Sequence, residues 1–78
     1  MEKSDLLKIT GRRIQKLREE KGLTQVDLVG KIEGSIDTTN ISRIEAGRTN
    51  PTLFTLSRIA QALEVSLSEL LNIEIPEN

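Results

Sequence analysis

The segment from Asp37 to Gly47 constrains the fold more than any other part of the chain, because residue type defines both of its ends. Asp37 is a favourable N-cap, since its carboxylate can accept a hydrogen bond from a backbone N–H of the first helical turn. Gly47 is a favourable helix stop, since glycine readily adopts the left-handed conformation that follows a helix. The segment therefore predicts a short helix with sharp boundaries.

The two sides of this predicted helix differ in chemistry. At about 100° per residue, Ile41, Ile44 and Glu45 fall on one side. Thr39 and Arg43 lie nearly opposite. An outward surface of hydroxyl, amide and guanidinium groups suits a helix that reads the DNA major groove, because arginine grips guanine through two hydrogen bonds and threonine or asparagine addresses other base edges. Surface helices of unrelated proteins often have the same distribution of apolar and polar residues, so the interpretation needs support from the rest of the chain.

Composition excludes several classes of function. The chain has 78 residues, which predicts one domain near the lower size limit for a core that is stable without metal or disulfide. It contains no cysteine and no histidine, which excludes zinc sites, disulfides and thiol or imidazole catalysis. Phe54 is the sole aromatic residue, so we expect no stacking platform for single-stranded nucleic acid. Carboxylates such as Glu19 and Glu20 lie on a polar face, so we expect no enzymatic activity, no cofactor and no metal.

The hydropathy of the chain predicts its cellular location. No four consecutive residues are apolar, so we expect neither a membrane span nor a secretory signal peptide. We therefore predict a cytoplasmic protein, and its size predicts no second domain for a small-molecule effector.

Charge is unevenly distributed along the chain. Residues 1–58 hold all 11 basic residues and eight acidic ones, a net charge of +3, whereas residues 59–78 hold four acids and no base. A basic part beside an acidic part fits a module with DNA at one face, although random clustering on a solvated surface explains the pattern equally well. Arg12, Arg13 and Lys16 are expected on a solvated helix face.

Capping residues and apolar spacing predict five helices in a single domain over residues 1–78, with a core over 5–71 and a short tail over 72–78. The predicted helices run from Ser4 or Asp5 to about Lys21, from Gln25 to about Ile32, over Asp37–Gly47, from Thr52 to Leu63 and from Ser66 to about Leu71. Gly11 inside the first helix favours a later start, nearer Thr10. The second and third helices, joined by a turn that contains glycine, form a helix-turn-helix unit.

Two charged residues lie on the apolar sides of their own helices. Arg18 follows Ile14 by four residues, and Glu45 follows Ile41 by four. Because an unpaired buried charge costs several kcal/mol, pairing is the economical arrangement. We predict an Arg18–Glu45 ion pair that fastens the third helix to the first. The alternative is that both side chains extend to solvent at the edge of the apolar stripe.

A series of motifs extends over roughly residues 10–71: Leu23-Thr-Gln25, Leu28, Ile41-Ser42-x-x-Glu45-x-Gly47, Asn50-Pro51-Thr-Leu53 and Ala60-x-x-Leu63-x-Val65. In order and spacing these motifs resemble the phage repressor/Cro (Xre-type) family of helix-turn-helix proteins. The resemblance implies an all-α, five-helix lambda-repressor-like domain that binds double-stranded operator DNA, usually as a two-fold dimer.

The resemblance also implies roles for individual residues. The base-reading positions of the family are occupied by Thr38, Thr39 and Arg43, with Asn40 and Ser42 as lesser candidates. The positions that meet the DNA backbone are occupied by Thr24, Gln25, Arg48, Thr49 and Asn50. The family glutamine that Gln25 resembles also supports a base-reading side chain. Arg18 and Glu45 coincide with a pair that forms a buried salt bridge in some members.

One stretch departs from the family pattern. The interval from Gln25 to Glu45 is two residues longer than the usual spacing, and the excess falls at Glu33-Gly34-Ser35. We therefore expect a looser turn there, with the third helix keeping its own register from Ile36 onward.

The C-terminal apolar residues exceed what one small core needs. We predict that they form a homodimer interface, with packing inside the chain as the alternative: Leu67, Leu70, Leu71, Ile73 and Ile75. The predicted function is a sequence-specific DNA-binding transcriptional regulator that binds a near-palindromic operator as a homodimer through the major groove. The alternative is an antitoxin or bridging-type protein-interaction module that uses the acidic, apolar C-terminal end.

Overall fold

The structure is a computed structural model in which residues 1–76 are described. Its helices are α1 (Lys3–Glu20), α2 (Gln25–Lys31), α3 (Thr38–Glu45), α4 (Leu53–Ala62) and α5 (Leu67–Leu70). All regular secondary structure in residues 1–76 is helical, which confirms the predicted all-α, five-helix fold. No helix in this part of the chain is both long enough and apolar enough to cross a membrane.

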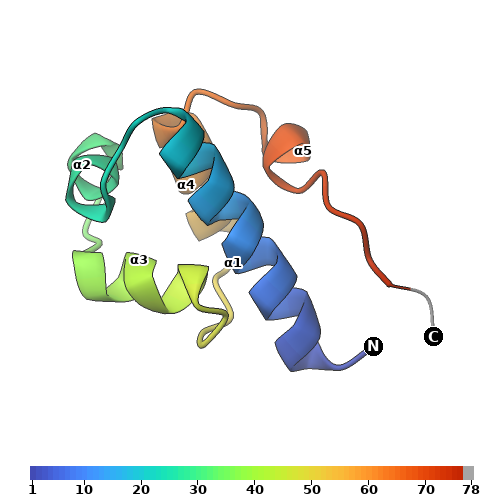
Figure 1. The fold of residues 1–78 in the computed structure, drawn as a ribbon. Coiled ribbons are helices and arrows are strands. Elements are labelled where there is room, and N and C mark those ends of the chain that lie inside the picture. The colour runs from blue at the N-terminus through green and yellow to red at the C-terminus, as the bar shows by residue number, and fades with distance from the viewer. Residues whose placement is uncertain (77–78) are drawn as a thin grey trace.

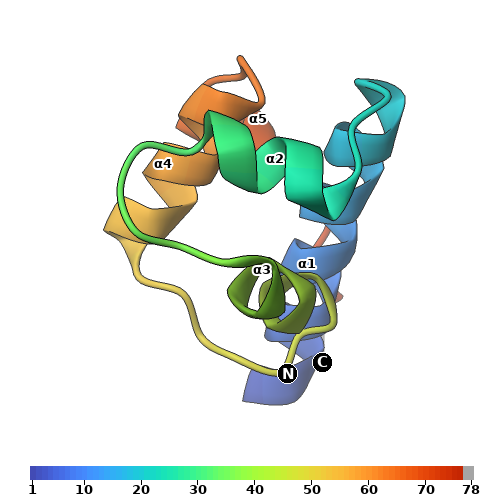
Figure 2. The same ribbon diagram turned by 90° about the vertical axis from the view of Figure 1, so that its left-hand side faces the viewer.

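The long helix α1 organises the other four (Figure 1). α2 and α3 lie on one side of it, α4 lies behind it, and α5 lies on the side away from α2. Seen from the side on which α3 begins, α2 crosses above α3, and a wide loop connects the two helices (Figure 2). Direct packing joins α1 to α3, α2 to α3 and α4 to α5.

The core draws on all five helices. Its fully buried large side chains are Ile14, Leu28, Ile41, Ile59, Leu63 and Leu70. Burying each of these side chains contributes roughly 1.5–3 kcal/mol to folding. The burial of Leu70 corrects one prediction, because a side chain with 0% exposure inside its own core is not available to a dimer partner.

The start of α1 differs from the prediction. The helix begins at Lys3, and its N-cap residue Glu2 makes no side-chain capping hydrogen bond, so neither Ser4 nor Asp5 caps it. The later start suggested by Gly11 is also wrong, because this glycine lies within the helix, at a crossing point. A Cβ atom on Gly11 would overlap the backbone carbonyls at the end of α3. Close packing of the two helices therefore outweighs the helix-propensity cost of glycine, about 1 kcal/mol.

The helices of the helix-turn-helix unit begin as their capping residues predict. Thr24 and Asp27 form a reciprocal capping box at the start of α2. The Asn40 N–H donates to the Asp37 carboxylate at 2.8 Å, which caps α3. These caps are local in sequence, which is why the boundaries of both helices were predictable.

Candidate nucleic-acid interface

A buried ion pair fixes the inner side of α3. The Nε of Arg18 lies 2.7 Å from Glu45 Oε2, and the Nη2 lies 3.0 Å from Glu45 Oε1. The exposed fractions of the two residues are 8% and 6%. The predicted Arg18–Glu45 pair is therefore present, with two hydrogen bonds. The hydrogen bond to Glu45 raises the pKa of Arg18, so this guanidinium stays charged throughout the pH range in which proteins fold.

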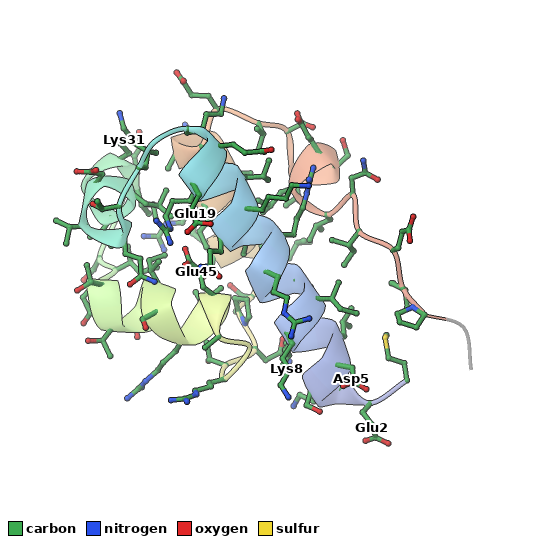
Figure 3. The ribbon with its side chains drawn as sticks, in the orientation of Figure 1. Glu2, Asp5, Lys8, Glu19, Lys31 and Glu45 are labelled. Carbon is green, nitrogen blue, oxygen red and sulfur yellow. The ribbon has the colours of Figure 1, made fainter. Side chains whose placement is uncertain are left out.

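The same two residues hold the start of the helix-turn-helix unit. Arg18 Nη1 donates to the carbonyl oxygen of Leu23 at 2.7 Å, just before α2. Gln25 Nε2, at the first position of α2, donates to Glu45 Oε1 at 3.1 Å. Figure 3 shows Glu45 projecting from α3 into the space between α3 and α1. One carboxylate thus joins three helices, and α2 and α3 are held in a fixed relative position.

The outer side of α3 remains open to solvent. Thr39, Ser42 and Arg43 are exposed, and Thr38 is half-buried. A shallow depression between α2, α3 and the following loop is lined by Gln25, Thr38, Thr39, Ser42, Arg43 and Arg48. Residues that the family resemblance assigned to base edges and to the DNA backbone therefore meet on one surface.

The electrostatics of this depression favour an anionic or hydrogen-bonding partner. No salt bridge occupies Arg43 or Arg48 within residues 1–76, where the ion pair of Arg18 is the only one. Two unpaired guanidinium groups therefore border a set of small hydroxyl groups. This arrangement provides positive charge for phosphates beside short side chains that let a base edge approach closely.

The remaining predicted DNA residues lie outside this depression. Asn40, Thr49 and Asn50 line a second hollow, which reaches Pro51, just before α4, and Arg58 on α4. The Thr24 hydroxyl accepts a hydrogen bond from the Asp27 N–H at 3.0 Å, so this side chain serves as the N-cap of α2. These four residues flank the central surface and do not form part of it.

Two arginine side chains have roles that sequence analysis missed. Arg13, predicted on a solvated face, is half-buried and donates from Nη2 to the Glu69 carbonyl oxygen of α5 at 2.9 Å. Arg58 of α4 donates from Nε to the Glu33 carbonyl oxygen at 2.6 Å. Both contacts join residues far apart in sequence, so no local pattern signals them.

Of the apolar C-terminal residues, Leu71, Ile73 and Ile75 form part of a groove, whereas Leu67 packs against the core. Leu67, Leu71 and Ile73 are half-buried, and Ile75 is 53% exposed. The groove runs between the first turns of α1, the Asn50–Pro51 loop, α4 and the tail, and its apolar lining is Leu6, Leu7, Leu56, Leu71, Ile73 and Ile75 together with Pro51. Leu70 is therefore excluded from the predicted dimer interface. The other predicted residues still present a partly exposed apolar surface.

Comparison with known proteins places this geometry in context. The family HTH_3, described as helix-turn-helix, matches residues 14–70. Over 66 residues the chain is 42% identical to an uncharacterized HTH-type transcriptional regulator, y4dJ, of Sinorhizobium fredii, which covers 85% of this chain and 83% of that protein. Two other relatives are longer proteins, and the chain spans 44% and 43% of their lengths.

Solved structures share the fold. The restriction-modification controller protein C.AhdI from Aeromonas hydrophila matches with a TM-score of 0.79 and 32% identity, over 88% of this chain and 96% of that one. The controller protein C.Esp1396I, solved as a tetramer in complex with its natural 35 base-pair operator, matches with a TM-score of 0.72 and 39% identity, over 86% and 96% of the two chains.

Proposed function

Because the chain belongs to the helix-turn-helix family HTH_3, we propose that it is a sequence-specific DNA-binding transcriptional regulator. It binds a near-palindromic operator as a homodimer and inserts α3 into the major groove. We propose further that it is a non-enzymatic regulator and that it acts in the cytoplasm. Its relatives support the proposal, since they include a transcriptional regulator and a controller protein solved on its operator.

One observation carries the proposal. The inner side of α3 is anchored to the protein, and its outer side is exposed to solvent. The ion pair of Glu45 with Arg18 holds the helix to the protein. The opposite side presents Thr39 and Arg43 to solvent, beside a depression that also contains Arg48. A groove-reading helix needs this combination, because base contacts lose specificity when the helix that carries them is free to tilt.

The proposed roles follow from position. Arg43 reads a base edge, most favourably guanine through two hydrogen bonds, and the hydroxyls of Thr38 and Thr39 read neighbouring bases. Asn40 and Ser42 are lesser base contacts. Gln25 meets a phosphate through the N-terminal end of α2, since its amide nitrogen already bonds Glu45. The other proposed backbone contacts are Thr24, Arg48, Thr49 and Asn50.

The proposed dimer brings two copies of α3 to successive major grooves. For a two-fold dimer, the two helices lie about one duplex turn apart, roughly 34 Å. The partly exposed apolar residues Leu67, Leu71, Ile73 and Ile75 supply the interface. Operator symmetry then mirrors the symmetry of the protein.

Selection of bound sites from a random pool of duplex oligonucleotides tests the proposal. The purified protein should enrich a motif of two inverted half-sites whose centres lie about one helical turn apart. Binding should weaken steeply as salt rises, because phosphate contacts release counterions. A pool without an enriched motif after repeated rounds would exclude sequence-specific recognition.

A second candidate function rests on the C-terminal groove. Exposed Glu69 and Glu74 lie next to the apolar residues that line it, which suits a docking surface for another protein in an antitoxin or bridging factor. The dependence of binding on salt concentration distinguishes the two functions. An apolar protein contact changes little with salt, whereas DNA binding through counterion release changes steeply.

A further inference from the structure

The turn between α2 and α3 is tied to α4 by one side chain. Arg58 Nε donates to the Glu33 carbonyl oxygen at 2.6 Å, across 25 residues of sequence. Within residues 1–76 this is the only hydrogen bond that joins residues 33–35 to another element. Glu33, Gly34 and Ser35 are themselves exposed, so little apolar burial holds them in place.

The guanidinium group fits closely between the turn and α4. Gly34 has a φ of +98°, and a Cβ atom there would overlap the guanidinium of Arg58. The Cζ of Arg58 also lies 5.7 Å from the centre of the ring of Phe54, which is one helical turn earlier on α4. The Nη2 of Arg58 is enclosed and has no hydrogen-bond partner. The Arg58 guanidinium thus contacts the Gly34 backbone and lies near the Phe54 ring, and its Nε hydrogen bond joins it to the turn.

We propose that Arg58 is a positioning residue for DNA recognition: it fixes the lengthened turn and thereby sets the position at which α3 begins. The inference rests on the proposed function, since it assigns α3 the role of reading DNA. Glu33 lies only four residues before Asp37, the N-cap of α3, and five before Thr38. A shift of the turn is therefore passed directly to the start of the reading helix.

The inner ion pair does not make this contact redundant. Glu45 is the last residue of α3, so its bonds to Arg18 and Gln25 hold the C-terminal end of the helix. At the N-terminal end, which carries Thr38 and Thr39, the fully buried Ile41 and the half-buried Ile36 anchor the chain to the core, and the turn before them determines where the helix begins. Arg58 and Glu45 thus hold opposite ends of the same helix.

A matched pair of substitutions separates the hydrogen bond from the charge. Arg58→Gln removes the charge but places an amide nitrogen at the position of Nε, because both atoms are bonded to Cδ. Arg58→Lys keeps the charge but places a methylene group at that position. If Arg58 positions the turn, Arg58→Gln should have nearly the same hydrogen exchange and DNA affinity as the unmodified protein. Arg58→Lys should differ from it in both.

The first readout needs no DNA. Amide hydrogen exchange should become faster at Asn40 and Ile41, whose N–H groups donate to Asp37 at the start of α3, in Arg58→Lys and Arg58→Ala, with the rest of the chain unchanged. Unchanged exchange in these variants would overturn the proposed fastening of the turn, whatever the outcome for DNA binding. Far-UV circular dichroism on each variant establishes that it is folded.

The second readout is the ratio of affinities for two duplexes of equal length, one selected by the unmodified protein and one of scrambled sequence. Arg58→Lys should lower the affinity for the selected duplex on the order of tenfold, as expected for loss of one hydrogen bond to a charged group. If Arg58 acts through the turn and not through a phosphate, the affinity for the scrambled duplex and the salt dependence should remain the same. Arg48→Ala should instead weaken binding to both duplexes and lower the salt slope by about one.

Two results of the binding measurements would also overturn the proposal. If Arg58→Lys binds as the unmodified protein does while Arg58→Gln binds weakly, Arg58 acts through its charge. If neither variant changes the affinity ratio, the turn does not govern recognition. Failure of the unmodified protein to select any duplex would instead count against the proposed function, and the hydrogen-exchange result would still decide whether Arg58 fastens the turn.

Discussion

Gly11 of α1 and Glu45 of α3 are in direct backbone contact: a Cβ atom on Gly11 would lie 2.8 Å from the carbonyl carbon of Glu45. The contact places the C-terminal end of α3 against the middle of α1, next to the ion pair that Glu45 forms with Arg18. Two helices therefore meet through backbone at one point and through a buried pair of charges at the next. The orientation of α3 depends on both contacts.

The first prediction concerns this crossing. Gly11→Ala should lower the free energy of unfolding by about 1–3 kcal/mol, because the added methyl group forces the two helices apart. Helix propensity alone would change the free energy in the opposite direction, by about 1 kcal/mol. Gly30→Ala is the matched control, because a Cβ atom there meets nothing within 4 Å. It should stabilise α2, and urea unfolding measures both changes.

The second prediction concerns the ion pair. Glu45→Gln should lower the free energy of unfolding by about 3 kcal/mol, because it leaves the buried guanidinium of Arg18 without its counter-charge. The double variant Arg18→Met, Glu45→Leu should recover much of this loss, because an apolar pair of similar volume needs no compensation. Chemical denaturation of the single and double variants measures the coupling. A single-variant loss no larger than that of Glu19→Gln, an exposed neighbour on α1, would contradict the prediction.

These contacts also show what sequence alone can predict. The Arg18–Glu45 pair was predictable, since each charge lies on the apolar side of its own helix and the two signs are opposite. Helix boundaries with a side-chain cap, such as that at Asp37, were predictable because the capping contact is local. The position of Gly11 was misread, because the reason for a glycine in α1 is another helix, remote in sequence.

The candidate site shows the same division. The outward residues of α3 follow from helical periodicity, which needs no knowledge of the other helices. The hydrogen bond of Arg58 to the Glu33 carbonyl oxygen depends on how α4 packs against a turn, and no spacing rule encodes it. Leu70 was assigned to an interface because the C-terminal apolar residues exceed what one small core needs, and a count of apolar residues does not tell which of them the chain itself covers.

The third prediction concerns base reading. Arg43→Ala should cost about 1–3 kcal/mol of binding free energy for a selected duplex and relax the preference at one base position in each half-site. Arg12→Ala is the control, since Arg12 is also exposed but lies on α1, outside the depression formed by α2 and α3. Binding measurements on duplexes with single base changes identify the position. Uniform weakening across all of these duplexes would assign Arg43 to the backbone instead.

The fourth prediction concerns the capping box of α2. The Thr24 backbone N–H donates to the Asp27 carboxylate at 2.9 Å, and this hydrogen bond, followed by that with the Thr24 side chain, lowers the pKa of Asp27. Because the folded-state pKa lies below the unfolded-state value, the stabilisation is complete above the ordinary carboxyl pKa and is lost as the pH falls through the lowered one. NMR titration of the Asp27 carboxyl should show this lowered midpoint. Thr24→Ala keeps the backbone N–H and removes only the side-chain contribution, so it should raise the midpoint in part, and an identical midpoint would contradict the side-chain contribution.

The fifth prediction concerns the dimer. Ile75→Asp should shift the chain from dimer to monomer without unfolding it, because Ile75 is 53% exposed and lies on the apolar groove. Leu53→Asp is the matched control, since Leu53 is 65% exposed on α4 but does not line that groove. Analytical ultracentrifugation at several concentrations should therefore find weaker association for Ile75→Asp alone. If Leu53→Asp dissociates the dimer and Ile75→Asp does not, the interface lies at the start of α4, and the C-terminal groove becomes free for a different partner.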